Sequence, residues 1–274
     1  MSSLKESNLS KERLEYLRKI KAKRVAILTV QLLILVCFFA LWELAARLKW
    51  IDPFITSQPS RVLRTIGNLY SEDQLFRHIG STCLETIAGF TIGTVLGTLA
   101  AVMLWWSNFL ARVLEPYLVV LNSLPKIALG PIFIIWIGPG PSAIIVMALA
   151  ISLIVTILEV LNGFLSADQE KIKLIQTFGG NRLQVFTKVV LPSNIPAIIN
   201  SLKINVGLSW VGVIVGEFLV SRQGLGYLIV YGGQVFQLDL VMTSVLILCV
   251  AAALMYQGVV WIEKRLVKSN PAQH

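Results

Sequence analysis

The chain has little charge and few of the side chains that usually carry catalysis. Of its 274 residues, 14% are charged, two are histidine and three are cysteine. His78 and the terminal His274 form no metal-binding pattern, and neither is an evident base for a serine within an apolar run. Cys37, Cys83 and Cys249 lie in or beside apolar runs without ligand spacing, so we expect each to pack as a small hydrophobe. These absences argue against a metalloenzyme or a hydrolase.

A phosphate-binding loop is also missing. The pattern G-x-x-x-x-G-K-[ST] does not occur in the chain. We therefore predict that the chain is not an enzyme, binds no cofactor and does not itself hydrolyse ATP.

Apolar residues are abundant, at 55% of the chain, and the charges cluster at its ends and in connecting segments. A soluble domain of this length does not need so much apolar surface, so the excess is expected to face lipid. We predict an all-α integral membrane protein with six transmembrane helices, without a signal peptide because the first run is too long for one. The predicted spans lie near residues 25–48, 82–105, 113–137, 141–164, 194–220 and 240–262.

The net charge of +9 is concentrated at the N-terminus, where residues 1–24 hold eight Lys or Arg against three Glu. A basic block directly before an apolar run follows the positive-inside rule, which explains the charge better than a nucleic-acid partner does. The N-terminus is therefore expected in the cytoplasm, and six crossings return the C-terminus there.

The predicted organisation has five parts. A basic segment (1–24) precedes the first span (25–48), an external segment (49–81), a five-helix core (82–262) and a cytoplasmic tail (263–274). Within the external segment, Pro59 followed by Val62, Ile66 and Leu69 predicts an amphipathic helix on the membrane surface, with a solvated loop as the alternative. The third and fourth spans are separated by a tight turn at 138–141.

The polar insert at 165–192 is predicted to be cytoplasmic and to hold two short helices. Asp168 can cap the first, and Gly179-Gly180 can end it in a left-handed conformation. Asn181 and Gln184 have capping-box spacing for the second, which Pro192 is expected to close. The plainer interpretation is an ordinary interfacial loop.

Several stretches of the chain resemble one family. Gly179, Phe186 and Leu191-Pro192 match the cytoplasmic signature Glu-Ala-Ala, three residues, Gly, then Leu-Pro, whereas Lys173-Leu174-Ile175 departs from Glu-Ala-Ala. Residues 124–129, 216–219 and 224–228 match further. The chain resembles permease subunits of binding-protein-dependent ABC importers of the nitrate/sulfonate/taurine type, from about residue 52 onward.

The resemblance implies a type I importer permease in the cell membrane, working as a dimer, most simply of two identical copies. Soluble ATP-binding subunits would use ATP and dock on the insert, and an external binding protein would deliver substrate. A small sulfonate-like or nitrate-like anion is the leading cargo, although such permeases also carry neutral or cationic vitamin precursors. The residues expected to couple to the ATPase are Lys173, Leu174, Ile175, Gly179, Gly180, Phe186, Leu191 and Pro192.

Polar residues within the spans are candidates for the translocation path, because burying them in lipid is costly. The candidates are Asn122, Lys126, Trp210 and Glu217. Lys126, beside Pro125, could favour anions or be paired structurally, and Glu217 could gate the path or tie helices together. Solvated or inter-helix roles are favoured for Glu43, Glu85 and Glu159.

Glycines recur every four residues at 89, 93 and 97 and at 212 and 216, which predicts close helix packing within the chain or across a dimer. A functional alternative remains: a transporter or channel driven by an ion gradient, with buried carboxylates as a proton relay. That alternative leaves the insert unexplained. A structural scaffold explains neither the insert nor the buried charges.

Overall fold

A computed structural model of the chain describes residues 11–268 and shows helices and connecting turns, with no strand in that range. The all-α prediction is confirmed. The first ten residues of the basic segment and the last six of the tail lie outside the described residues. The chain divides into two compact units, residues 1–64 and 65–274, which are described separately.

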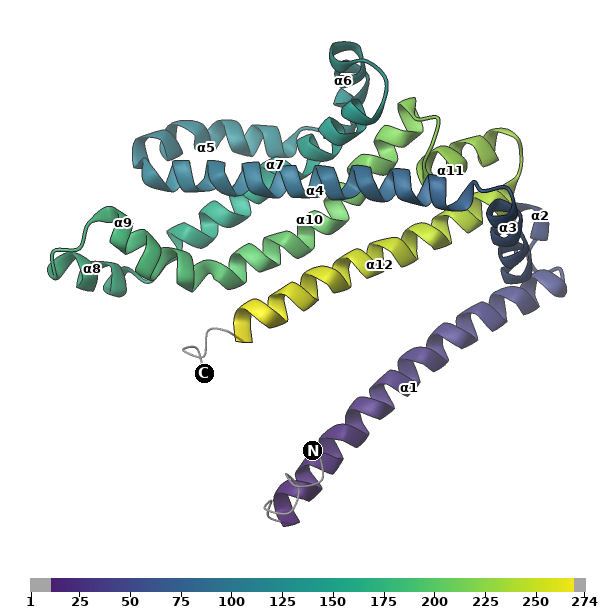
Figure 1. The fold of residues 1–274 in the computed structure, drawn as a ribbon, viewed down its shortest axis with the longest axis horizontal. Helices are drawn as coiled ribbons and strands as arrows, with labels where there is room; N and C mark the ends of the chain where they lie inside the picture. The colour runs from purple at the N-terminus through teal and green to yellow at the C-terminus, as the bar shows by residue number, and fades with distance from the viewer. Residues whose placement is uncertain (1–10, 269–274) are drawn as a thin grey trace. The chain divides into compact units, whose positions relative to one another are not determined.

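The first unit contains α1 (Lys11–Arg47), α2 (Pro53–Thr56) and the start of α3 (Pro59–Ser71), as labelled in Figure 1. The apolar part of α1 is long enough to cross a membrane, and its most apolar stretch buries no residue within the chain, as expected for a helix facing lipid. Near its end, the Glu43 carboxylate accepts hydrogen bonds from Arg47 Nε (2.7 Å) and from Ser60 N and Oγ (both 3.0 Å). Glu43 thus joins α1 to α3. The predicted helix at Pro59 is confirmed, and its place on a membrane surface stays a prediction.

The second unit is a bundle of long helices with short helices at its ends (Figure 1). Its elements after α3 are α4 (Leu75–Trp106), α5 (Asn108–Ser123), a 3₁₀ turn (Lys126–Leu129), α6 (Gly130–Ile137), α7 (Pro141–Leu165), α8 (Gln169–Thr177), α9 (Arg182–Val185), a π-helical turn (Phe186–Val190), α10 (Leu191–Val220), α11 (Leu225–Gln234) and α12 (Leu238–Lys268).

The centre of the second unit is α7, which packs between α4 and α10. A β-carbon added at Gly97 of α4 would lie 2.6 Å from Thr156 Cβ of α7, and one added at Gly212 of α10 would overlap the Ala148 backbone. The recurring glycines therefore let α4 and α10 approach α7 closely, so the predicted close helix packing is found within the chain. This contact places α7 at the core of the helix bundle.

The predicted third span is not one straight helix. α5 and the 126–137 segment meet at 87°, and the chain counts six membrane crossings only if this bent pair is one of them. Pro125 explains the break, because proline lacks an amide donor and disfavours helical backbone in the preceding residue. Leu124 accordingly has extended backbone (φ −65°, ψ 140°). The span predicted at 113–137 is thus bent at Pro125 into two helical segments.

Pro192 does not close the second helix of the insert, contrary to the sequence prediction. α9, the π-helical turn and α10 run on as one apolar stretch, Arg182–Val220, that is long enough to cross a membrane. Pro192 lies in the first turn of α10, where a missing amide donor is tolerated. At the end of the π turn, Leu191 N donates to Phe186 O instead of to the residue four positions back. The insert is therefore joined to the fifth predicted span without a break.

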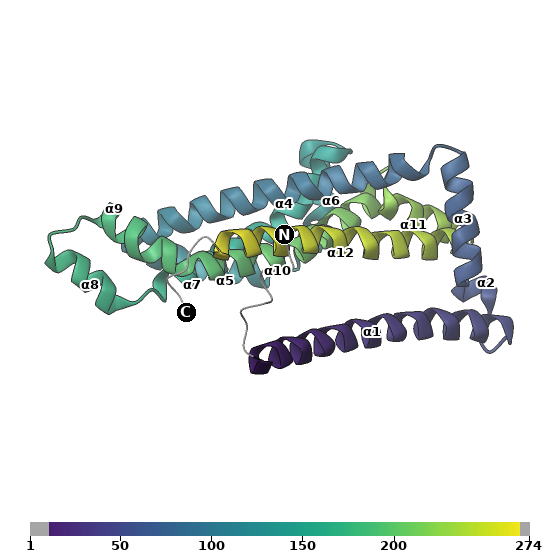
Figure 2. The same cartoon turned by 60° about the horizontal axis from the view of Figure 1, so that its bottom comes forward.

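The short helices mark opposite ends of the second unit. In Figures 1 and 2, α8 and α9 lie beyond one end of α7 and α10, whereas α11 lies toward the other end. Sequence reasoning assigned no helix to α11, which follows Gly224 (φ 110°). The insert and the α10–α11 connection are thus two separate polar regions of one bundle.

Candidate functional site

The insert is a helical hairpin with specific caps at its turns. Asp168 Oδ1 accepts hydrogen bonds from Glu170 N (2.9 Å) and Lys171 N (3.3 Å) and starts α8. These backbone donors, that of Lys171 foremost, hold the pKa of the Asp168 carboxyl below its usual range. Gly179, at φ 75°, donates to Gln176 O (2.9 Å) while Gly180 donates to Ile175 O (2.9 Å), which is the Schellman ending.

The second half of the hairpin begins with the predicted capping box. Gln184 N donates to Asn181 Oδ1 (2.9 Å), and Asn181 N donates to Gln184 Oε1 (2.8 Å). Reciprocal capping satisfies two amides that a helix start leaves open. The three caps therefore fix both helices and the angle of the turn between them.

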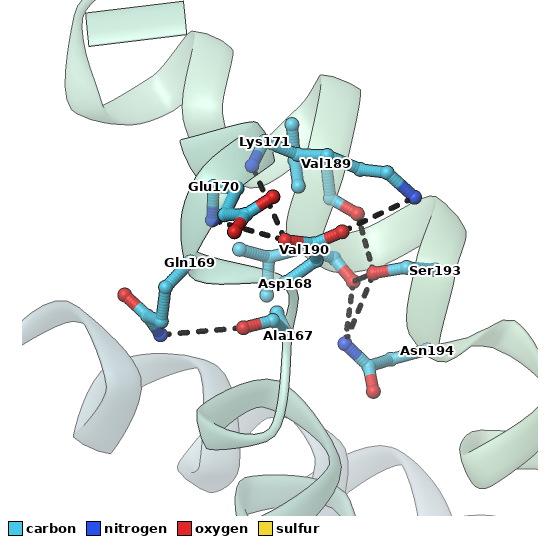
Figure 3. A network of polar contacts seen from close by, with 9 residues as sticks. All are labelled: Ala167, Asp168, Gln169, Glu170, Lys171, Val189, Val190, Ser193 and Asn194. Carbon is cyan, nitrogen blue, oxygen red and sulfur yellow. Dashed lines mark hydrogen bonds and ion pairs between the residues drawn. The ribbon is translucent and has the colours of Figure 1, made fainter. Parts of the chain in front are cut away.

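Where the hairpin joins the bundle, side chains supplement the backbone hydrogen bonds. Ser193 Oγ donates to Val189 O (2.6 Å), and Asn194 Nδ2 donates to Val190 O (2.8 Å), as Figure 3 shows beside the first turn of α8. Both carbonyls belong to the π turn. The junction between the hairpin and α10 is therefore hydrogen-bonded through its irregular turn.

An aromatic cluster ties the hairpin to the end of α4. The Arg182 guanidinium lies 5.4 Å from the Trp105 ring centroid, and its Nη2 donates to Trp105 O (3.0 Å). The Phe186 ring lies 5.0 Å from Trp105 and 5.5 Å from Phe164 of α7. We call Arg182, Trp105, Phe186 and Phe164 the aromatic anchor. It connects the hairpin to α4 and α7 in addition to its covalent link to α10.

The outer face of the hairpin carries exposed apolar side chains. Phe178 is 82% exposed, Leu174 57% and Leu183 56%. Lys173 and Gly179 also lie outside, whereas Ile175, Phe186 and Leu191 pack into the core beneath. The predicted coupling residues thus divide into an outer set and an inner set. Phe178 and Leu183 belong with the outer set, and their place beside the turn in the sequence could have indicated this.

The four candidate path residues do not come together in the chain. Lys126 Nζ donates to Asn122 O (3.1 Å) and Oδ1 (3.3 Å) at the break after α5. Trp210 is buried against Val206 and Val259 in an apolar cluster. Glu217 is buried near the end of α10 that is farther from the insert. Asn122 and Lys126 form a pair, and Trp210 and Glu217 lie elsewhere.

The surroundings of Glu217 join three helices through residues far apart in the sequence. Gly226 N donates to Glu217 Oε2 (2.5 Å), and Gly224 N donates to His78 Nδ1 (3.0 Å), 146 residues away. Leu225 N donates to Thr82 Oγ1 (2.7 Å). The start of α11 is therefore capped by side chains of α4 and α10. No periodicity in the sequence indicated His78 or Thr82.

Comparison with known proteins agrees with this architecture. Residues 93–269 match the family described as "binding-protein-dependent transport system inner membrane component". The chain belongs to this family. It is a permease subunit of an ABC importer and a multi-pass membrane protein, and ATP is hydrolysed in this family by a separate subunit. Family membership decides against the ion-gradient alternative.

Curated relatives include a "probable ABC transporter permease protein" of Haemophilus influenzae, 29% identical over 238 residues (87% of this chain, 96% of the relative). The formylaminopyrimidine transport permease protein ThiX of Halalkalibacterium halodurans is 30% identical over 188 residues (68% and 74%). The putative aliphatic sulfonates transport permease protein SsuC of Escherichia coli is 26% identical over 235 residues (86% and 89%). Permeases named for different solutes are thus among the relatives of this chain.

Solved structures share the fold. The chain matches a subunit of the inward-facing methionine transporter MetNI with a TM-score of 0.62 at 21% identity, covering 73% of this chain and 97% of that one. A bacterial importer of the polysaccharide alginate matches with a TM-score of 0.63 at 16% identity, covering 90% and 99%. The type I importer permease fold predicted from the resemblance is confirmed.

Proposed function

We propose that this permease binds its ATPase through the outer face of the capped hairpin and passes the motion of the ATPase to the bundle through the aromatic anchor. The supporting observation is the division of the hairpin into an exposed apolar face and an inner face packed on α4, α7 and α10. An exposed Phe and two exposed Leu on a rigid, capped element suit a protein partner. A rigid hairpin can transmit displacement as a body because its caps resist bending.

The transporter is further proposed to contain two copies of this permease, two ATP-binding subunits and an external binding protein that delivers the solute. The cargo is proposed to be a small sulfonate-like anion. Two observations support this cargo: permeases named for aliphatic sulfonates and taurine are among the relatives, and Lys126 lies partly exposed at a helix break. A cation at a break in the span is available to a solute passing between two copies.

Docking can be tested by co-purification from gently solubilised native membranes. The double variant Leu174→Asp with Phe178→Asp is expected to lose the ATP-binding subunit, because two charges replace the apolar contact face. Asn68→Asp, exposed on α3 and therefore outside the hairpin, serves as the control and is expected to retain that subunit. Retention by the double variant, with both variants folded and inserted, would overturn the proposed docking surface.

A further inference from the structure

A second carboxyl group lies against the buried Glu217. Glu85 of α4 is 5% exposed and Glu217 of α10 is 1% exposed, and their side chains are within hydrogen-bonding reach of each other. Ser81 Oγ approaches Glu85 Oε1 at 3.5 Å, too far for a strong hydrogen bond. The pair is buried between helices of the same chain, not in contact with lipid.

One carboxyl oxygen of each acid in this pair lacks a hydrogen-bond donor within residues 11–268. The Glu217 carboxyl accepts from the backbone N–H of Gly226, and the Thr82 hydroxyl and the Tyr227 N–H also lie close to it. Oε1 of Glu217 and Oε2 of Glu85 are buried and have no hydrogen-bond partner among the described residues. An unsatisfied buried oxygen destabilises the fold, and more so if it is charged. Each acid therefore lacks one donor.

No positive charge in residues 11–268 forms an ion pair with either of the two acids. His78 uses Nδ1 to accept from Gly224 N, and Arg77 Nε donates to Gln223 Oε1 (3.3 Å). Arg222 lines the cavity beside Glu85 without an ion pair to it. Two ionised carboxylates in contact at such a site would repel each other at low dielectric.

We propose that Glu85 and Glu217 form a binding site for one proton. Glu85 carries the proton and donates it in a hydrogen bond to the Glu217 carboxylate, whose charge is also stabilised by the backbone amides that begin α11. One proton supplies the donor that the unpartnered oxygens lack. It also reduces the buried charge of the pair from two to one.

The shared proton would hold α4, α10 and the first turn of α11 together. Glu85 lies on α4, Glu217 lies on α10, and Glu217 accepts from the first turn of α11. Gly224 has room for no side chain because a β-carbon there would overlap the Glu217 carboxylate. A cavity of about 410 Å³, lined by Ser81, Glu85, Pro139, Arg222 and Gln223, adjoins the pair and offers water a route to it. The protonated pair therefore holds the α10–α11 loop against α4.

The test uses the full-length chain in lipid nanodiscs with its partner subunits and does not depend on which surface the ATPase uses. Infrared difference spectroscopy at neutral pH, on exchange from H₂O to D₂O, detects the C=O stretch of a protonated carboxylic acid. We expect the wild type to show this band, Glu85→Gln to lose it, and the exposed control Glu72→Gln to keep it. Absence of the band in the wild type, or its survival in Glu85→Gln, would overturn the proposal.

Stability provides a second readout. Glu85→Gln is expected to melt within about 2 °C of the wild type, because the amide NH₂ donates to Glu217 as the acid does. Glu85→Leu removes the donor and is expected to melt several degrees lower, since a shift of about 2–4 °C per kcal/mol applies to a domain of this size. Equal destabilisation by both substitutions, or stabilisation of the wild type by Na⁺ over choline, would contradict a shared proton.

Discussion

Single residues decide where the chain bends and where a solute could meet a charge. Pro125 ends α5, whereas Pro116 lies inside the same helix without ending it. The difference is that Leu124 takes extended backbone and the helix restarts in a new direction after Pro125. Lys126, which the sequence placed in the middle of a span, consequently lies at a corner and donates to Asn122.

At the same scale, Lys126→Met tests the proposed role of this cation. The substitution keeps most of the length of the unbranched side chain and removes the charge, so uptake of a radiolabelled alkyl sulfonate by the complete transporter is expected to fall at least tenfold. Lys126→Arg, which keeps the charge, is expected to retain most of the activity. Normal uptake by Lys126→Met would mean that Lys126 only caps the corner.

The Asp168 cap should depend on pH in a defined direction. Because folding lowers the pKa of Asp168, the ionised cap stabilises α8 at neutral pH, and this stabilisation is lost as the pH falls through the lowered pKa. Asp168→Ala is therefore expected to speed hydrogen exchange of the Glu170 and Lys171 amides severalfold between about pH 5 and 8. Asp168→Asn, also a good cap, should exchange nearly as slowly as the wild type. Equal exchange in all three proteins would show that the cap does not hold the first turn.

Some of the contacts that position the helices could be predicted from the sequence, and others could not. The caps at Asp168, Gly179 and Asn181 were predictable because each involves residues within a few positions. The glycine periodicity at 89, 93 and 97 also predicted a close helix contact, but α7 as the partner could not be inferred, since nothing local to α4 specifies it. The His78–Gly224 bond likewise escaped prediction because 146 residues separate its partners.

The packing of α7 against α10 can be tested with two glycines of one helix. A β-carbon at Gly212 overlaps the Ala148 backbone, whereas one at Gly207 meets no atom within 4 Å. Gly212→Ala is expected to destabilise the fold by about 1–3 kcal/mol, a typical cost of overpacking. Gly207→Ala is expected to be neutral or slightly stabilising because alanine is the better helix former. Thermal unfolding in detergent measures both, and similar melting temperatures would contradict the packing.

A change in the aromatic anchor is expected to impair transport without preventing the ATPase from docking. Arg182→Ala removes the contacts to Trp105 but leaves the outer face of the hairpin, so the ATPase is expected to remain bound. Substrate-dependent ATP hydrolysis and uptake are expected to fall severalfold, because the aromatic anchor then holds α4 only through the ring contacts of Phe186. Leu183→Ala, which trims an exposed side chain beside the same turn, provides a comparison at the outer face. Unchanged uptake in Arg182→Ala would show that α10 alone carries the motion.

Across the whole second unit, the two polar regions lie toward opposite ends of the bundle: the hairpin at α8 and α9, and the capped start of α11. Both are tied to α4 and α10, which run between them. Movement at the hairpin can therefore reach the α10–α11 loop through continuous helices. The cytoplasmic position of the hairpin and the external position of that loop remain predictions from the charge at the N-terminus.

The most direct measurement is a crosslink between the hairpin and the ATPase in intact membranes. Phe178→Cys, in a background with Cys37, Cys83 and Cys249 replaced, presents a single exposed thiol on the outer face. A thiol-specific photocrosslinker at that position is expected to capture the ATP-binding subunit, with a yield that changes when ATP is added. Crosslinking to lipid or to the second permease copy alone, in a transporter that still hydrolyses ATP, would contradict the proposed coupling role of the hairpin.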